Sequence, residues 1–219
     1  MTVYFYRMSR PSHRSRIHET LRLRLLRGEV GPDVRLVDHA IAEEMGVSRM
    51  PVREALMQLV SEGYLESTSR GFALPDLSPQ RIAEVFTLRR LLEPHAVACA
   101  ARDRSEAQLR ALRAALESAR AAVDVAGFHR GAEAFRNVWL DAVANVELRH
   151  AIQRYSGQVQ SVRFATLPDA RARRVILEGL AALLRNFETG DGPAAQDRML
   201  RFIYDAEDSY RRVAAGTET

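Results

Sequence analysis

Two helical segments joined through a single glycine constrain the fold of this chain more than any other feature. Residues 38–45 have the apolar spacing of a helix, and Gly46 follows them with the residue best suited to a left-handed helix cap. Ser48 is a good N-cap for another helix, and Pro51 is tolerated in its first turn, where backbone N–H groups have no intrahelical partner. The sequence therefore predicts two helices joined by a tight turn.

A preceding helix and a following hairpin complete the pattern. Residues 15–27 carry apolar side chains at helical spacing until Gly28 ends the run. After Gly63, the segment YLESTSRGFALPD alternates around a polar turn at residues 68–71, as a two-stranded hairpin does. Three helices and a hairpin describe a winged helix-turn-helix, which we assign to residues 15–75.

The rest of the chain has helical periodicity throughout. The proline-containing segment LPDLSPQ marks the boundary, so we assign residues 76–79 to a linker and residues 80–219 to a second domain. The predicted fold class is mainly α, with an N-terminal winged helix-turn-helix followed by an all-helical bundle.

Local signals set the expected helix ends in this bundle. Ser78 caps the first helix with Pro79 at its first position, and Pro94 kinks or breaks it. A capping box opens the next helix at Ser105, and Gly127 stops that helix. The further helices are expected at about residues 128–143, 146–165, 169–189 and 193–214.

Bulk composition argues against a membrane-spanning chain and favours the cytoplasm. The chain has no run of about 18 apolar residues, and its first residues lack the charged-then-apolar order of a signal peptide. The lone Cys99 lies in an alanine-rich helical pattern, and we interpret it as a small buried thiol in a reducing cytoplasm.

All 32 basic residues are arginine, and the net charge is +4. This modest positive excess permits a polyanionic partner without demonstrating one. Residues 1–14 form a basic arm that contains no acid and carries Arg7, Arg10 and Arg14. Three interpretations of the arm stay open: a flexible segment on DNA phosphates, a disordered tail, or sequence upstream of a true start at Met8.

The pair Arg49 and Arg53 is the first candidate for a functional site. The two residues are four apart, so they project from the same side of one helix near its N-terminus. An arginine can bind guanine through two hydrogen bonds in the major groove or clamp phosphate oxygens, and Ser48 offers a hydroxyl to a phosphate. Solvated arginines on a helix surface are the alternative, but a helix-turn-helix followed by a hairpin favours DNA.

The stretch GVSRMPVREALMQLVSEGYL, followed by RGFALPD, resembles the DNA-binding domain of GntR-family transcription regulators. By that resemblance, Arg49 and Arg53 read bases or phosphates from the recognition helix. The resemblance also places His39 where relatives contact the DNA backbone, and Arg70 and Gly71 at a wing tip that enters the minor groove. On its own pattern, His39 is equally well a surface histidine.

The helical domain resembles, more loosely, the ligand-binding FCD domain of the FadR-like branch of that family. The segments EVFTLRRLLEPHAVACAA, AVANVEL and ETGDGPAAQDRML carry the likeness, with Arg89 and Glu93 in the R-x-x-x-E places. The resemblance implies a homodimer that binds a near-palindromic operator in double-stranded DNA. It also implies an effector-binding and dimerisation role for this domain.

Many FCD domains bind a divalent metal through one aspartate and three histidines. Counting from Asn145 and from the pair Gly190–Asp191 places those four positions on this chain. They fall on Ala132, Arg136, Leu180 and Phe202. None of these residue types suits such a site, so we expect no metal and no other cofactor.

An arginine at a former metal position still attracts an anion. Arg136 is that cation, Arg89 is a candidate second clamp, and Trp139 lies three residues beyond Arg136. Leu180 and Phe202 make the expected pocket floor apolar. These residues predict an acidic effector with a hydrophobic portion, such as an organic acid or acyl compound. The alternative is a filled pocket whose arginines are surface or ion-paired residues.

The sequence therefore predicts a ligand-responsive DNA-binding regulator, with repression relieved by ligand as the expected sign. An enzyme is disfavoured, because neither a cysteine–histidine or serine–histidine–acid pattern in a supporting context nor a phosphate-cradling glycine loop occurs. A DNA-binding regulator that ignores ligands, with its effector pocket filled, remains the alternative.

Overall fold

A computed structural model of the chain describes residues 13–26, 29–31, 34–75 and 78–217. These residues fall into two compact units that divide after Pro75. Most of the predicted basic arm and residues 76 and 77 of the predicted linker lie outside the described residues. No helix in the described ranges is long and apolar enough to cross a membrane.

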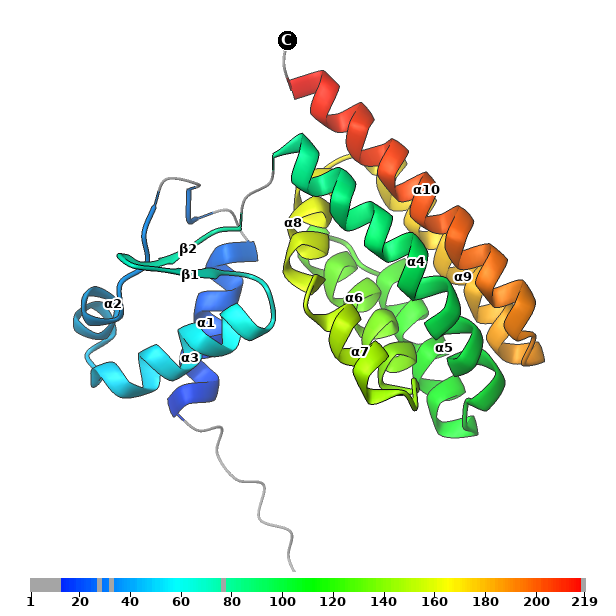
Figure 1. The fold of residues 1–219 in the computed structure, drawn as a ribbon, viewed down its shortest axis with the longest axis horizontal. Helices are drawn as coiled ribbons and strands as arrows, with labels where there is room; N and C mark the ends of the chain where they lie inside the picture. Colours follow the sequence, from blue (N-terminus) through cyan, green and yellow to red (C-terminus); the bar gives the residue numbers. More distant parts are fainter. Residues whose placement is uncertain (1–12, 27–28, 32–33, 76–77, 218–219) are drawn as a thin grey trace, which may run out of the picture. The chain divides into compact units, whose positions relative to one another are not determined.

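The first unit is a winged helix-turn-helix, as predicted (Figure 1). Its elements are α1 (His13–Leu26), α2 (Asp38–Met45), α3 (Arg49–Ser61), β1 (Glu66–Thr68) and β2 (Gly71–Ala73). Gly46 closes α2 in the left-handed conformation with φ of 64°, which confirms its predicted role as a cap. Helix α1 packs on α3 through buried aliphatic side chains that include Leu21, Leu56 and Leu59.

The wing is tied to the segment that precedes α2. Strands β1 and β2 pair antiparallel, with Thr68 opposite Gly71, and Leu36 exchanges two backbone hydrogen bonds of 2.8 Å with Phe72. Gly71 has φ of 119°, and a Cβ atom there would lie 2.6 Å from the carbonyl oxygen of Leu36. Glycine is therefore required at this position for the wing to close against its neighbour.

The second unit is an all-helical bundle, which confirms the predicted fold class (Figure 1). Its helices are α4 (Pro79–Asp103), α5 (Glu106–Arg120), α6 (Val125–Asp141), α7 (Val146–Gln153), α8 (Ser156–Thr166), α9 (Ala170–Thr189) and α10 (Gly192–Thr217). Helix α4 packs along α10, α5 packs on α6, and α9 contacts both α5 and α10. Large apolar side chains such as Phe86, Phe135, Trp139 and Phe187 fill the core.

Two predicted helix starts in this unit are confirmed. The hydroxyl oxygen of Ser78 accepts a hydrogen bond from the backbone of Arg81, and Pro79 is the first residue of α4. Ser105 and Gln108 form both hydrogen bonds of a capping box. Pro79 therefore belongs to the helix and not to the linker.

Four expectations for this unit are wrong, and the first two concern helix ends. Helix α4 continues through the buried Pro94 to Asp103, so of the expected kink or break at Pro94 the break is wrong. Gly127 does not end a helix but lies in the first turn of α6. Asp124 is the N-cap of α6, and its carboxylate accepts a 2.6 Å hydrogen bond from the backbone N–H of Gly127.

The other two concern a helix and a thiol. The single helix expected over residues 146–165 is two helices, α7 and α8, which separate at Arg154 and Tyr155, directly before the turn-favouring pair Ser156–Gly157. Cys99 is not fully buried, and its Sγ atom lies 3.8 Å from Nε2 of His95 on the next turn of α4.

Candidate nucleic-acid interface and effector site

The recognition helix α3 presents two arginines to solvent at its N-terminal end. The side chains of Arg49 and Arg53 are 66% and 64% exposed, while Val52 and Leu56 on the same helix are fully buried. Met50 is also exposed beside Arg49. This separation leaves the guanidinium groups free to meet a ligand while the same helix anchors itself in the core.

A buried carboxylate from α2 holds both arginines. Oδ1 of Asp38 accepts a 3.0 Å hydrogen bond from Nη2 of Arg49, and Oδ2 lies 3.6 Å from Nη1 of Arg53. Burial raises the pKa of Asp38. The hydrogen bond from Arg49 and its positive charge act in the opposite direction, together with the backbone N–H of His39 and the charge of Arg53. Their combined effect outweighs burial, so the pKa of Asp38 is lowered. Asp38 is therefore ionised at neutral pH and fixes the direction of the pair.

The remaining predicted DNA contacts lie on the surface of the same unit. Ser48 is the N-cap of α3, yet its hydroxyl makes no capping hydrogen bond within the described part of the chain, and it is exposed. His39 is exposed on α2, and Arg70 is exposed in the turn of the wing. Gly71 shapes that turn rather than offering a side chain, since its missing Cβ lets the wing approach Leu36.

In the second unit, one buried carboxylate binds two buried arginines. Oε1 of Glu93 accepts hydrogen bonds from Nε of Arg89 at 3.1 Å and from Nη1 of Arg136 at 3.2 Å. Burial raises the pKa of Glu93, but the charges of Arg136 and Arg89 outweigh it and lower the pKa below its ordinary value of 4.5. The ion pair joins α4 to α6 in the core.

Trp139 supports this cluster from the core. Its ring lies 5.4 Å from the Arg136 guanidinium carbon, and Phe86 stacks with Arg89 in the same way at 5.2 Å. The predicted neighbourhood of Arg136 and Trp139 is present. Trp139, however, is a core residue and is not among the residues that line the cavity described below.

A third arginine, which sequence reasoning missed, lies close to this cluster. Arg163 projects from α8, and its Nη1 atom is shielded from solvent with no hydrogen-bond partner among the described residues. Burial, followed by the charges of Arg136 and Arg89, lowers the pKa of Arg163 to about 9. The available signal was an arginine on the face of α8 that carries Val159 and Val162.

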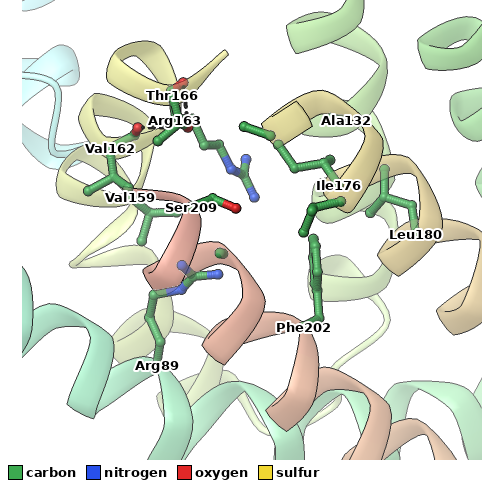
Figure 2. A pocket seen from close by; sticks show the side chains of 13 residues that line it. Arg89, Ala132, Val159, Val162, Arg163, Thr166, Ile176, Leu180, Phe202 and Ser209 are labelled. Atoms are coloured by element: carbon green, nitrogen blue, oxygen red, sulfur yellow. Dashed lines mark hydrogen bonds between the residues drawn. The ribbon is translucent and has the colours of Figure 1, made fainter. Parts of the chain in front are cut away.

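A small cavity of about 30 Å³ lies among α4, α6, α8, α9 and α10 (Figure 2). Arg89 and Arg163 line one side of it, and Leu180, Phe202 and Ala132 line another. Of the four residues that the family resemblance aligns with metal ligands, Ala132, Leu180 and Phe202 therefore border one cavity. The fourth, Arg136, is buried beside it on Glu93 and is not among the lining residues.

Metal ligands do not gather around this cavity. Among the described residues, no group of three histidine, cysteine, aspartate or glutamate side chains is placed to hold an ion. The buried His129 instead pairs its Nε2 atom with Oε1 of Gln160 at 2.8 Å. The polar side chains that line the cavity are those of Arg89, Arg163, Thr166 and Ser209, and arginine nitrogens bind anions and not cations.

Family comparisons decide what kind of protein carries this architecture. The gntR family of bacterial regulatory proteins matches residues 13–72, and the FCD domain matches residues 84–205. The chain belongs to the GntR family, in its FCD-domain branch. Members of this family are DNA-binding transcriptional regulators and not enzymes, and so is this chain.

Curated relatives extend over different shares of this GntR-family chain. An uncharacterized regulator, YdhC of Bacillus subtilis, is 24% identical over 201 residues, which cover 87% of this chain and 88% of YdhC. The gluconate operon transcriptional repressor of Bacillus subtilis is 37% identical over 86 residues, 39% of this chain and 35% of the repressor. McbR of Escherichia coli is 33% identical over 102 residues, 46% of each chain.

Solved structures show the same fold. Escherichia coli McbR/YncC has a TM-score of 0.75 at 23% identity, covering 92% of this chain and 98% of that one. A GntR regulator of Rhodococcus sp. RHA1 has a TM-score of 0.70 at 20% identity, covering 92% and 97%. The helix-turn-helix unit and the FCD unit thus follow one another in this regulator as in those structures.

Replacing Asp38 by Asn tests whether the carboxylate orients the two arginines of the recognition helix. We expect affinity for a duplex selected by the wild-type protein from random DNA to fall about tenfold, because one charge-assisted contact is lost. Affinity for unselected DNA should stay constant or rise, since a negative charge is removed. Fluorescence anisotropy titrations measure both.

Glu43→Gln, which removes an exposed carboxylate from the same helix, is the matched control and should change neither affinity. The orienting role would be contradicted if Asp38→Asn lowered the affinity for selected and unselected DNA by the same factor, or if it lowered neither affinity.

Replacing Glu93 by Gln tests the buried ion pair of the FCD unit. We expect the free energy of unfolding at pH 7 to fall by about 3 kcal/mol, because two buried arginines lose their counter-charge. Since the folded pKa of Glu93 lies below its ordinary value of 4.5, its contribution is complete above that value and is lost as the pH falls below it. The difference between variant and wild type should therefore shrink at acid pH.

Urea denaturation from pH 7 to pH 3 measures this difference. Glu178→Gln on the exposed face of α9 serves as the control and should have little effect. A Glu93→Gln variant as stable as wild type at pH 7 would show that the cluster contributes nothing to folding.

Proposed function

We propose that this GntR-family regulator is a cytoplasmic repressor that binds a near-palindromic operator as a homodimer. An acidic small molecule in the FCD unit releases it. The observation that carries this proposal is the exposed pair Arg49 and Arg53, held side by side by the buried Asp38. The name of the gluconate operon repressor supports repression as the sign of control.

Recognition of DNA would use the N-terminal end of α3 in the major groove. Each of the two guanidinium groups can donate two parallel hydrogen bonds to a guanine edge or bind a phosphate. The free hydroxyl of Ser48 can donate to a phosphate, and exposed His39 and Arg70 supply further backbone contacts. In a dimer, two such helices would read half-sites about one helical turn apart.

Control by an effector would act through α4. This helix carries Arg89 and Glu93 of the buried cluster, and it begins at Pro79, directly after the linker to the DNA-binding unit. A ligand that binds better in one arrangement of the dimer shifts the population toward that arrangement. The family resemblance aligns Arg136 with a metal-binding histidine, and the positive charge of Arg136 supports an anionic effector that binds without a metal.

The size of the cavity favours a second candidate function. At about 30 Å³ it has room for only about two water molecules, and Arg89 and Arg136 are already ion-paired with Glu93. An acyl compound or an acid with a large apolar portion needs side chains such as Phe202 to move. If they do not move, the protein is a DNA-binding regulator that ignores ligands.

The DNA-binding proposal predicts that changing Arg49 and Arg53 together to alanine abolishes operator protection. Affinity for the selected duplex should fall at least a hundredfold. The slope of log K against log salt concentration should become less steep by about one or two, because one or two phosphate contacts are lost. Footprinting should show two symmetric protected halves for the wild type. Arg110→Ala, on the exposed face of α5, should bind like the wild type.

A double variant that protects the same operator as tightly as the parent would overturn this proposal. Circular dichroism confirms that the variants are folded, so that loss of binding reports on the contacts themselves.

The effector proposal predicts that at least one compound in a panel of organic acids and acyl thioesters weakens the operator complex at least fivefold. The operator titration is repeated with each compound at constant ionic strength, because salt alone weakens the complex. An unchanged affinity across the whole panel would favour the regulator that ignores ligands.

A further inference from the structure

We propose that Met50, which lies between the two arginines of the recognition helix, reads a thymine by contact with the 5-methyl group of that base. This inference rests on the proposed placement of α3 in the major groove and deepens it. It assigns a specificity-determining role to an apolar side chain. It also predicts a thymine in each half of the operator, at a position that the two arginines do not read.

The first support is the place of Met50 on α3. Four fully buried side chains form the stripe that packs into the core, those of Val52, Ala55, Leu56 and Leu59. At the spacing of an α-helix, Met50 lies roughly half a turn around the helix axis from the middle of this stripe. Arg49 and Arg53 lie to one side of that direction. Met50, and neither arginine, therefore occupies the centre of the outward face.

The second support is the exposure of this large apolar side chain. Met50 is 66% exposed, more than any other large apolar side chain in the described part of the helix-turn-helix unit. Contact with an apolar group of a ligand removes such a surface from water and stabilises the complex. Since exposed Arg49 and Arg53 flank Met50, the group that covers it belongs to the ligand that these arginines bind.

The third support is the chemistry of the major groove. Base pairs present hydrogen-bond donors and acceptors there, and the 5-methyl group of thymine is the apolar member of this pattern. A thioether has no donor and is only a weak acceptor, so Met50 suits neither a phosphate nor a polar base edge. Met50 is the second residue of α3, and the N-terminal residues of a recognition helix are those that contact base edges.

The neighbouring charges keep the outward face of α3 away from phosphates. Glu54, one turn beyond Met50, is exposed, and the DNA backbone would repel its carboxylate. The cations lie on the side of α2, where Asp38 binds both Arg49 and Arg53. The centre of the face therefore combines an apolar group with a negative charge, an arrangement that suits base edges and not the backbone.

Replacing thymine by deoxyuridine tests the inference, because this change removes only the 5-methyl group. The duplex that the full-length wild-type protein selects from random DNA is synthesised again with each thymine replaced in turn. Fluorescence anisotropy measures the affinity for each duplex. We expect one position in each half to lower the affinity about fourfold, which is the loss expected for one methyl group returned to water.

Met50→Ala should remove this dependence and bind the thymine duplex and the uridine duplex equally. Met57→Ala is the matched control, because Met57 is 47% exposed on the same helix face but about 10 Å further from the N-terminal end. This control should keep the fourfold difference. Both substitutions truncate exposed side chains, so both variants should unfold at the same temperature as wild type.

A selection from random DNA by Met50→Ala gives a second measurement. The variant should lose the preference for thymine at the position that deoxyuridine identified. It should retain the preferences at the remaining positions, because Arg49 and Arg53 are unchanged. Loss of preference at every position would show that Met50 supports the binding surface as a whole, and would overturn its role as the reader of one base.

The uridine results separate this inference from the proposed function. A wild-type protein that selects no duplex would contradict the proposed function and, with it, this inference. Tight binding to a selected duplex with no loss at any uridine would overturn the methyl contact alone. The same loss in wild type and in Met50→Ala would assign the methyl group to another side chain, and would also overturn the role of Met50.

Discussion

At the candidate site of each unit, a carboxylate holds two arginine side chains. In the helix-turn-helix unit, Asp38 binds Arg49 and Arg53, whose guanidinium groups remain exposed. In the FCD unit, Glu93 binds Arg89 and Arg136 in the core. The chain uses arginine for all 32 of its basic residues, and the planar guanidinium group can bind a carboxylate with some of its donors while others stay available.

Solvent exposure separates the two uses of this arrangement. In the helix-turn-helix unit, Asp38 is itself buried, but the two arginine side chains that it orients are exposed and hydrated. In the core, Glu93 pairs with Arg89 and Arg136, and one nitrogen each of Arg136 and Arg163 is buried without a hydrogen-bond partner among the described residues. An electrostatic cost of that kind lowers stability, and functional sites are where proteins tolerate it. An anion that accepted hydrogen bonds from the unpaired arginine nitrogens would remove this electrostatic cost, and the free energy recovered would add to its affinity.

The sequence predicted the elements whose signals are local and missed those that depend on tertiary contacts. Gly46, the Ser105 capping box and the wing at residues 68–71 each follow from backbone chemistry and were placed correctly. Pro94 is a local breaker, yet α4 continues through it, and the break between α7 and α8 lies beside a local signal, Ser156–Gly157, that the prediction of one long helix overlooked. Arg49 and Arg53 were found from spacing. Asp38 and Arg163 were missed because their importance comes from which side chains the fold brings beside them.

The most direct test of the account is a double-mutant cycle between Asp38 and Arg49, with operator affinity as the measured quantity. If Asp38 acts by orienting Arg49, the variant that carries both Asp38→Asn and Arg49→Ala should bind the operator no more weakly than Arg49→Ala alone. Losses of affinity that simply add in the double variant would contradict the orienting role of the carboxylate.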